Sequence, residues 1–223
     1  MKSGGNPFYL EQLARSLRRH GGAGDAPDVS LSGIEVPSAV AASLNEELGL
    51  LSNDARRVLE GASVAGDPFE PELAAAAAAT SEAAAMEAID ELLLLDLVRS
   101  TEVPRRFRFR HPLIRRAVYE ATPGGWRLGA HERCAELLAA RGASAAARAH
   151  HVQRSAREGD LGAVAVLREA GEGAARLAPA SAANWFAHAL RLLPARRGPG
   201  RADRAPARAF CSADRERALR RQS

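Results

Sequence analysis

The feature that most constrains the fold is a helical spacing of apolar residues, which runs through most of the chain and is interrupted only once. In one segment after another, apolar residues recur three and four positions apart. The exception is residues 98–110, where Phe107 and Phe109 alternate with arginines, as in a hairpin with one apolar and one charged face. Hydrophobic residues make up 46% of the chain and aromatic residues only 4%. The apolar surface is therefore mostly alanine and leucine, which suits packed helices better than a β-sandwich.

The same spacing divides the chain into elements and domains. Helices are predicted over 7–20, 37–50, 52–65, 70–79, 81–98, 112–121, 126–140, 144–157, 160–177 and 180–193. Ser52 and Ser81 are the expected N-caps. The helices of 37–122 and the hairpin at their end follow the order of a winged-helix domain. The helices of 123–194 follow one another in pairs, as in a degenerate α-solenoid of the tetratricopeptide (TPR) kind.

The distribution of charge weakens a nucleic-acid interpretation of the sequence pI of about 9.8. The formal net charge is +4, but residues 195–223 hold nine arginines and only three acidic residues. The basic charge therefore belongs to a Gly/Pro/Arg-rich tail, which is expected to be disordered, and residues 1–194 are slightly acidic. The chain has no signal peptide and no apolar run long enough for a membrane span, so we expect a cytoplasmic protein without membrane contact. Cys134 and Cys211 are expected to be reduced thiols.

Two short motifs point to a ligand. In the first, Gly5, Asn6 and Pro7 make a stiff turn before the helix of 7–20, although a plain helix start would look the same. In the second, His111 stands between the second hairpin strand and the next helix. An imidazole at a helix N-terminus can hydrogen-bond an anion such as a phosphate, or it can simply cap the helix.

Taken in this order and at this separation, the motifs GNPFYLEQLARSL and FRHPLIRRAVYE resemble those of STAND-class signal-transduction ATPases. The resemblance is to the large LuxR-type bacterial transcriptional regulators that carry an ATPase module, and it covers about residues 3–193. It implies that residues 1–24 are a remnant of the ATPase helical lid and that residues 25–36 are a linker to the winged-helix domain.

The resemblance also implies a nucleotide site. Pro7 would pack on the adenine and His111 would contact the β-phosphate of ADP, with Gly5, Asn6 and Arg110 in supporting positions. In such a regulator, ADP holds the winged helix against the ATPase core and exchange for ATP releases it. The helical repeats would sense an inducer or a protein partner.

The chain departs from that family in its phosphate-binding half. A phosphate loop needs GxxxxGK[ST], and the only lysine is Lys2, outside any such pattern. Residues 92–96 mimic a metal-binding strand, but they continue a helical face. We therefore predict a non-catalytic fragment that binds adenine nucleotide weakly or not at all alone. Its partners would be a missing ATPase core and an inducer, and DNA only through a missing C-terminal helix-turn-helix.

Two other functions stay open, a protein-interaction scaffold that ignores nucleotides and a DNA-binding winged helix. The helix of 81–98 would be the recognition helix, but it carries five acidic residues and no basic one. No metal site is predicted, because neither His131-x-x-Cys134 nor His150-His151 belongs to a set spaced for zinc. No Ser/His/Asp or Cys/His set suggests nucleophilic catalysis.

Overall fold

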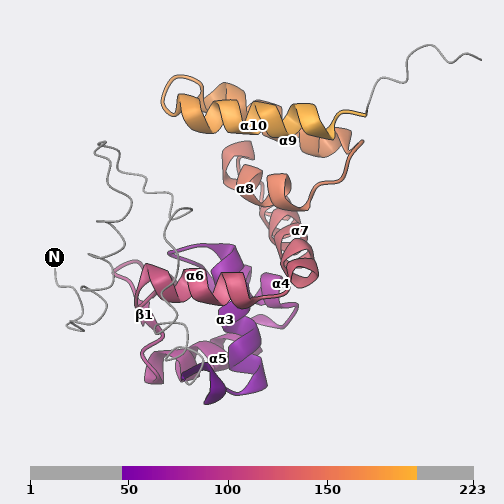
Figure 1. The fold of residues 1–223 in the computed structure, drawn as a ribbon. Helices are drawn as coiled ribbons and strands as arrows, with labels where there is room; N and C mark the ends of the chain where they lie inside the picture. Colours follow the sequence, from indigo (N-terminus) through magenta and orange to yellow (C-terminus); the bar gives the residue numbers. More distant parts are fainter. Residues whose placement is uncertain (1–46, 195–223) are drawn as a thin grey trace, which may run out of the picture.

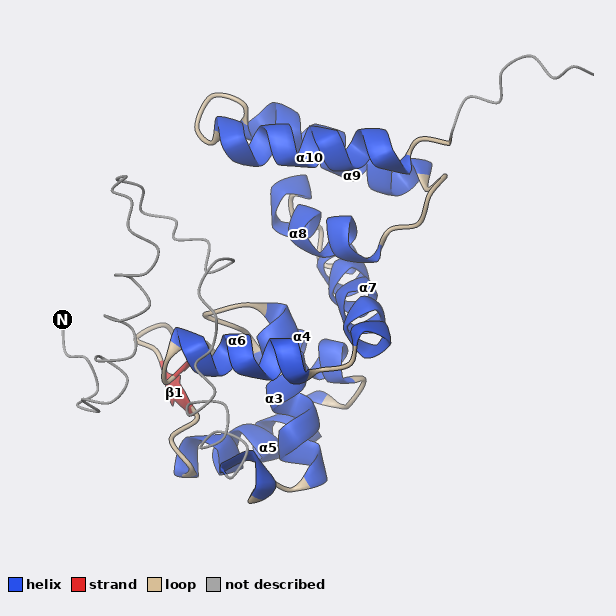
Figure 2. Ribbon diagram, viewed as in Figure 1, coloured by secondary structure: helices blue, strands red, loops and turns tan. Residues whose placement is uncertain are grey.

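The computed structural model describes residues 47–194, which are mainly helical with one small two-stranded antiparallel hairpin (Figure 2). The elements are α3 (Asn53–Ala65), α4 (Pro71–Ala78), α5 (Glu82–Leu94), β1 (Val98–Ser100), β2 (Phe107–Phe109), α6 (Pro112–Ala121), α7 (Gly124–Ala140), α8 (Ala145–Ser155), α9 (Leu161–Ala174) and α10 (Pro179–Leu192). Of the predicted helix over 37–50, residues 47–50 fall within the description: residues 47–49 are helical and Leu50 is in a turn. The lid over 1–24, the linker over 25–36 and the tail over 195–223 lie outside the described residues.

The predicted helix starts are confirmed at both serines. The Ser52 side chain accepts a hydrogen bond from the Ala55 N–H, and the Ser81 side chain accepts one from the Ala84 N–H. Each serine satisfies a backbone donor that has no partner inside the first turn of its helix.

The predicted end of α5 is wrong. The helix stops at Leu94 rather than at Val98, because Asp96 adopts a left-handed conformation with φ of 51°. The Leu97 N–H then bonds the Leu92 carbonyl at 3.0 Å, which closes the helix and turns the chain into β1. Leu97 and Val98 are buried, so their apolar character belongs to the start of the hairpin and not to one more helical turn.

The hairpin has the predicted apolar and charged faces. Val98 pairs with Phe109 and Ser100 with Phe107, and Phe109 is buried. Phe69, from the turn between α3 and α4, forms an additional antiparallel bridge to Phe107, with N···O distances of 2.8 and 3.0 Å. The three phenylalanine rings pack together, so the hairpin is fixed to the helical core through Phe69.

The main core lies between α3, α4, α5, α6 and the hairpin. The α3–α4 contact is very close because Gly61 faces α4 without a side chain. A Cβ atom at Gly61 would lie 2.5 Å from the Ala74 carbonyl oxygen. The many alanines of α4 allow this approach, since they add little bulk between the two backbones.

Helix α7 packs on this core as well as on α8 (Figure 1). Ala130 and Cys134 of α7 are buried against Val64 and Ala77. The Arg133 guanidinium donates to the carbonyls of Ala76, at 2.8 Å, and Ala77 at the end of α4. The start of the 123–194 segment therefore shares a core with residues 47–122.

Beyond α7, the chain continues as α8 and the antiparallel pair α9 and α10, which lie side by side at the far end of the molecule (Figure 1). Ala145, Ala149, Leu167 and Ala189 form the core of this part. The order of elements is the one predicted, whereas the winged-helix and TPR-like assignments stay predictions. Within residues 47–194, no helix is both long enough and apolar enough to cross a membrane.

The close α3–α4 contact gives a testable expectation. Gly61→Ala should lower the free energy of unfolding by about 1–3 kcal/mol, because the new methyl group meets backbone that cannot rotate away. Urea denaturation of the full chain measures the effect. Gly173→Ala in α9 is the matched control, since its methyl group would enter open space. That variant should be neutral or up to about 1 kcal/mol more stable, and equal effects of the two changes would contradict the packing described.

Candidate functional site

His111 occupies the predicted position between β2 and α6, and it caps the helix. Its Nδ1 accepts a hydrogen bond from the Leu113 N–H at 3.1 Å. A nitrogen that accepts from a backbone N–H carries no proton, so the neutral ring has its proton on Nε2. Capping was one of the two roles considered for His111, and the tautomer that it imposes makes Nε2–H a hydrogen-bond donor.

The surroundings of His111 keep the ring neutral. Partial burial and the neighbouring charge of Arg110 lower the pKa of His111 below its ordinary value. The Arg110 guanidinium lies 3.0 Å from a carboxylate oxygen of Glu47 and 3.9 Å from one of Asp96. Arg110, predicted to support a phosphate contact, is thus engaged by carboxylates of its own chain. Pro7, Gly5 and Asn6 lie outside the described residues.

Two other arginines of the hairpin, Arg105 and Arg106, are also held by carboxylates, whereas Arg108 of β2 is exposed. Arg105 bonds Glu72 and Glu82, and Arg106 lies 3.2 Å from Glu70. Arginines paired in this way offer less charge to a DNA backbone than the sequence of the hairpin indicates.

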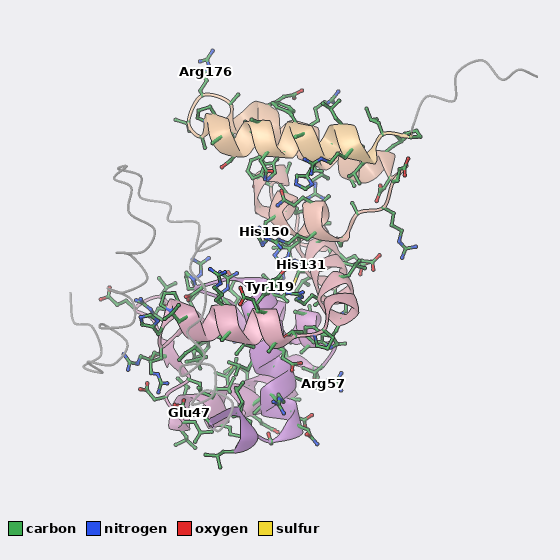
Figure 3. All side chains as sticks on the ribbon, in the orientation of Figure 1. Glu47, Arg57, Tyr119, His131, His150 and Arg176 are labelled. Atoms are coloured by element: carbon green, nitrogen blue, oxygen red, sulfur yellow. The ribbon has the colours of Figure 1, made fainter. Side chains whose placement is uncertain are left out.

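A second group of side chains, not predicted as a site, gathers where α6, α7 and α8 meet. We call it the elbow cluster, and it consists of Arg115 and Tyr119 of α6, Arg127 and His131 of α7, and His150, His151 and Arg154 of α8. Figure 3 shows His131 and His150 between α8 and Tyr119 of α6. His131 and His151 are buried, whereas His150 and Arg154 are exposed.

A chain of hydrogen bonds runs through the elbow cluster. Arg154 donates to the Tyr119 hydroxyl at 3.0 Å, and that hydroxyl lies 3.0 Å from Nε2 of His131. Nδ1 of His131 lies 3.0 Å from Nδ1 of His151. If the Tyr119 hydroxyl donates its proton to Nε2 of His131, that ring carries its own proton on Nδ1 and donates to His151. All members are then satisfied with both histidines neutral.

Burial and positive charge keep the clustered histidines neutral. Desolvation, followed by the neighbouring histidines and arginines, lowers the pKa of His131 to about 3. Desolvation and the charges of Arg115 and Arg154 lower the pKa of His151 to about 4. Desolvation, followed by the charges of Arg154, His151 and Arg115, lowers the pKa of His150 to about 4 as well, although part of the residue is exposed.

Sequence reasoning missed this cluster because α8 buries two faces. Ala145, Ala149 and Val152 pack toward α9 and α10, and an amphipathic interpretation of α8 assigns only that face to the interior. His151 points the other way, against α7. His150 is exposed and His151 is buried, so the two adjacent histidines lie at the edge of this second buried face. One sequence signal could have indicated the cluster: two adjacent histidines stand in a helix that packs between two other helices, α7 and α9.

The structure also shows how the residues whose spacing resembles that of metal ligands are placed. His131 faces Tyr119 and His151, whereas the Cys134 thiol points to the Leu73 carbonyl, 3.8 Å away. Burial raises the pKa of Cys134 to about 12, so the thiol stays protonated and is a poor metal ligand. Within the described part of the chain, no three His, Cys, Asp or Glu residues are arranged to hold a metal ion.

The depressed histidine pKa values predict a loss of stability in acid. Below about pH 6.5 these histidines are protonated in the unfolded chain but stay neutral in the folded chain. As the pH falls, the free energy of unfolding therefore decreases by up to roughly 1.4 kcal/mol per pH unit for each histidine. His131→Gln should reduce this slope between about pH 6.5 and pH 5. The glutamine side chain can still accept from Tyr119 and donate to His151, but it does not titrate.

Urea denaturation of the full chain at a series of pH values measures this slope. His188→Gln in α10 is the comparison variant. The pKa of His188 is also lowered, but this half-buried histidine is less desolvated than the buried His131, so His188→Gln should change the slope less than His131→Gln does. A slope unaffected by His131→Gln would show that His131 does not titrate as described.

The cap formed by His111 predicts different outcomes for two substitutions. His111→Ala removes the acceptor of the Leu113 N–H and should cost about 0.5–2 kcal/mol of stability. His111→Asp keeps an acceptor at a favoured N-cap position, so it should retain most of that stability. Thermal unfolding of both variants compares them, and equal losses would mean that the cap contributes little.

Comparison of the chain with protein-family models, curated proteins and solved structures yields no match. The function is therefore argued from the residues and their arrangement.

Proposed function

We propose that the chain is a non-catalytic regulatory module of a nucleotide-switched, LuxR-type bacterial transcriptional regulator. Residues 37–122 would respond to the ADP or ATP state of an ATPase core in the cytoplasm, and the helices of 123–194 would carry the sensor. The observation that carries this proposal is the setting of His111. It directly follows β2, starts α6 and, through its cap bond, keeps a proton on Nε2.

The proton on Nε2 gives His111 the right polarity for a phosphate oxygen. A phosphate offers only acceptors at neutral pH, so a ring that accepts through Nδ1 and donates through Nε2 is suited to it. The N-terminus of α6 adds the partial positive charge of its backbone N–H groups. His111 would therefore hold the β-phosphate of ADP without carrying a charge of its own.

The switch would act by a shift between two populations. ADP held jointly by His111 and an ATPase core would favour the closed arrangement, and ATP would favour release. The shift cannot exceed the difference in nucleotide affinity between the two arrangements. The shared packing of α7 with α3 and α4 supports this coupling, because movement of residues 47–122 would carry the first sensor helix with it.

A protein-interaction scaffold is the second candidate. It is favoured by leucines that remain exposed on the last helical pair, Leu161, Leu190 and Leu193. Such side chains suit a protein partner or a further repeat. A direct DNA-binding winged helix is the third candidate, and the acidic residues of α5 and the paired hairpin arginines both weigh against it.

The nucleotide proposal is tested by nitrogen NMR of the histidine side chains in the full chain. Millimolar ADP should shift the Nε2 resonance of His111, because the phosphate accepts its proton, whereas adenosine should not. The affinity should be weak, since the chain has no phosphate loop. His111→Asp keeps the cap but repels the phosphate. Because it removes the reporting ring, its effect is read at the backbone N–H of Leu113, which ADP should no longer shift.

His188→Gln is the control, and it should leave the ADP response of His111 intact. The proposal fails if ADP and adenosine shift His111 equally, or if millimolar ADP leaves it unmoved. Micromolar or tighter binding would contradict the assignment of most phosphate contacts to a separate ATPase core.

A further inference from the structure

Within residues 47–194, the elbow cluster concentrates positive charge that few carboxylates balance. Arg115, Arg127 and Arg154 take part in none of the salt bridges found among the described residues. The charges of described residues that act on His131, His150 and His151 are all cationic. The one carboxylate that acts on Arg115 belongs to Asp67, whose Oδ1 already accepts from the Phe109 N–H at 3.2 Å.

Two of these arginines converge on one aromatic ring. The guanidinium of Arg127 lies 4.7 Å from the centre of the Tyr119 ring, and that of Arg154 lies 5.7 Å from it. Two guanidinium groups on one ring, with Arg115 close enough to act on the same histidines, repel one another. A bound anion would offset this repulsion, which the described carboxylates leave largely uncompensated.

The donors of the cluster are placed to receive such an anion. Each guanidinium has five N–H donors, and Tyr119 takes one from Arg127 at its carbonyl and one from Arg154 at its hydroxyl. Arg154 and His150 are exposed, so a ligand can reach them from solvent. Arg115 is half-buried and donates through Nε to the Ser63 carbonyl at 3.0 Å. Planar arginine groups bind phosphate oxygens through paired hydrogen bonds.

We propose that the elbow cluster is a binding site for a tetrahedral phosphate-class dianion, held by Arg115 of α6 together with His150 and Arg154 of α8. The ligand is either free phosphate or the phosphoryl group of a small phosphate ester. The site is distinct from the one proposed at His111, and it joins α6 to α8 across the shared helix α7.

Binding is coupled to protons through the histidines. The charged and titratable groups that face the histidines directly are Arg115 and Tyr119 of α6, Arg127 of α7 and Arg154 of α8. Two further groups act on these arginines: Asp67 acts on Arg115, and His188 of α10 interacts with Arg154. A dianion beside His150 compensates the charge of a protonated ring, so it binds the protonated form more tightly. Anion affinity therefore rises as the pH falls.

The proposal is tested by thermal unfolding of the full chain with phosphate, compared with chloride at the same ionic strength. Phosphate at ten times its dissociation constant should raise the unfolding temperature by about 4 °C, because it binds only the folded chain. Arg154→Gln should abolish most of this rise, and since Arg154 is exposed the variant is expected to fold. Arg168→Gln is the control, at an exposed arginine of α9 that pairs with Glu172 within its own helix.

The coupling between anion binding and protons is tested with sulfate, a dianion of similar shape that does not titrate between pH 6 and pH 7.5. Its dissociation constant should fall several-fold from pH 7.5 to pH 6. His150→Gln should remove most of that change. An unchanged sulfate affinity across this range would exclude the coupling to His150.

The two ligand sources are separated by comparing inorganic phosphate with glycerol 3-phosphate. Tighter binding of the ester indicates a small phosphorylated ligand, and tighter binding of inorganic phosphate indicates the free ion.

The site itself is excluded if chloride stabilises the chain as much as phosphate does, or if Arg154→Gln keeps the full phosphate effect. His111→Asp should leave the stabilisation by phosphate intact. A failure of the anion site at the elbow cluster is therefore distinguishable from a failure of the nucleotide proposal at His111.

Discussion

The contact between Arg133 and the end of α4 determines how the two parts of the molecule relate. The last carbonyls of a helix lack partners within the helix and carry partial negative charge, and the guanidinium of Arg133 supplies both donors and charge to Ala76 and Ala77. Ala130 and Cys134 pack beside it. Helix α7 is thereby part of the first core, although it begins the series of helical pairs. Any function that links these parts acts through this helix.

Helix α6 is the element that the two proposed sites share. His111 begins it, and Arg115 and Tyr119 follow at intervals of four residues, which places all three along one side of the helix. The nucleotide proposal concerns the first of these residues, and the anion proposal concerns the other two. A rigid helix between two ligands lets each affect the binding of the other, with the same coupling free energy in both directions.

Local signals in the sequence predicted most of the fold, and pairwise contacts decided the rest. Ser52 and Ser81 cap helices because a hydroxyl can satisfy a nearby N–H, which is a property of a few adjacent residues. The left-handed turn at Asp96 has no strong local signal, so the end of α5 was misplaced. The bond between His131 and His151 joins residues twenty positions apart, and no periodicity indicates it. His111 was predictable in position, whereas its cap bond was one of two alternatives.

The two buried faces of α8 limit how the chain can change in length. One face carries Ala145 and Ala149 toward α9 and α10, and the other carries His151 toward α7. One residue inserted between positions 145 and 151 would rotate the two faces relative to each other by about 100°, and no sliding of the helix would restore both. Evolution can therefore lengthen the turns on either side of α8 more freely than the helix itself, and related chains should preserve the spacing of its alanines and histidines even where the residues around them diverge.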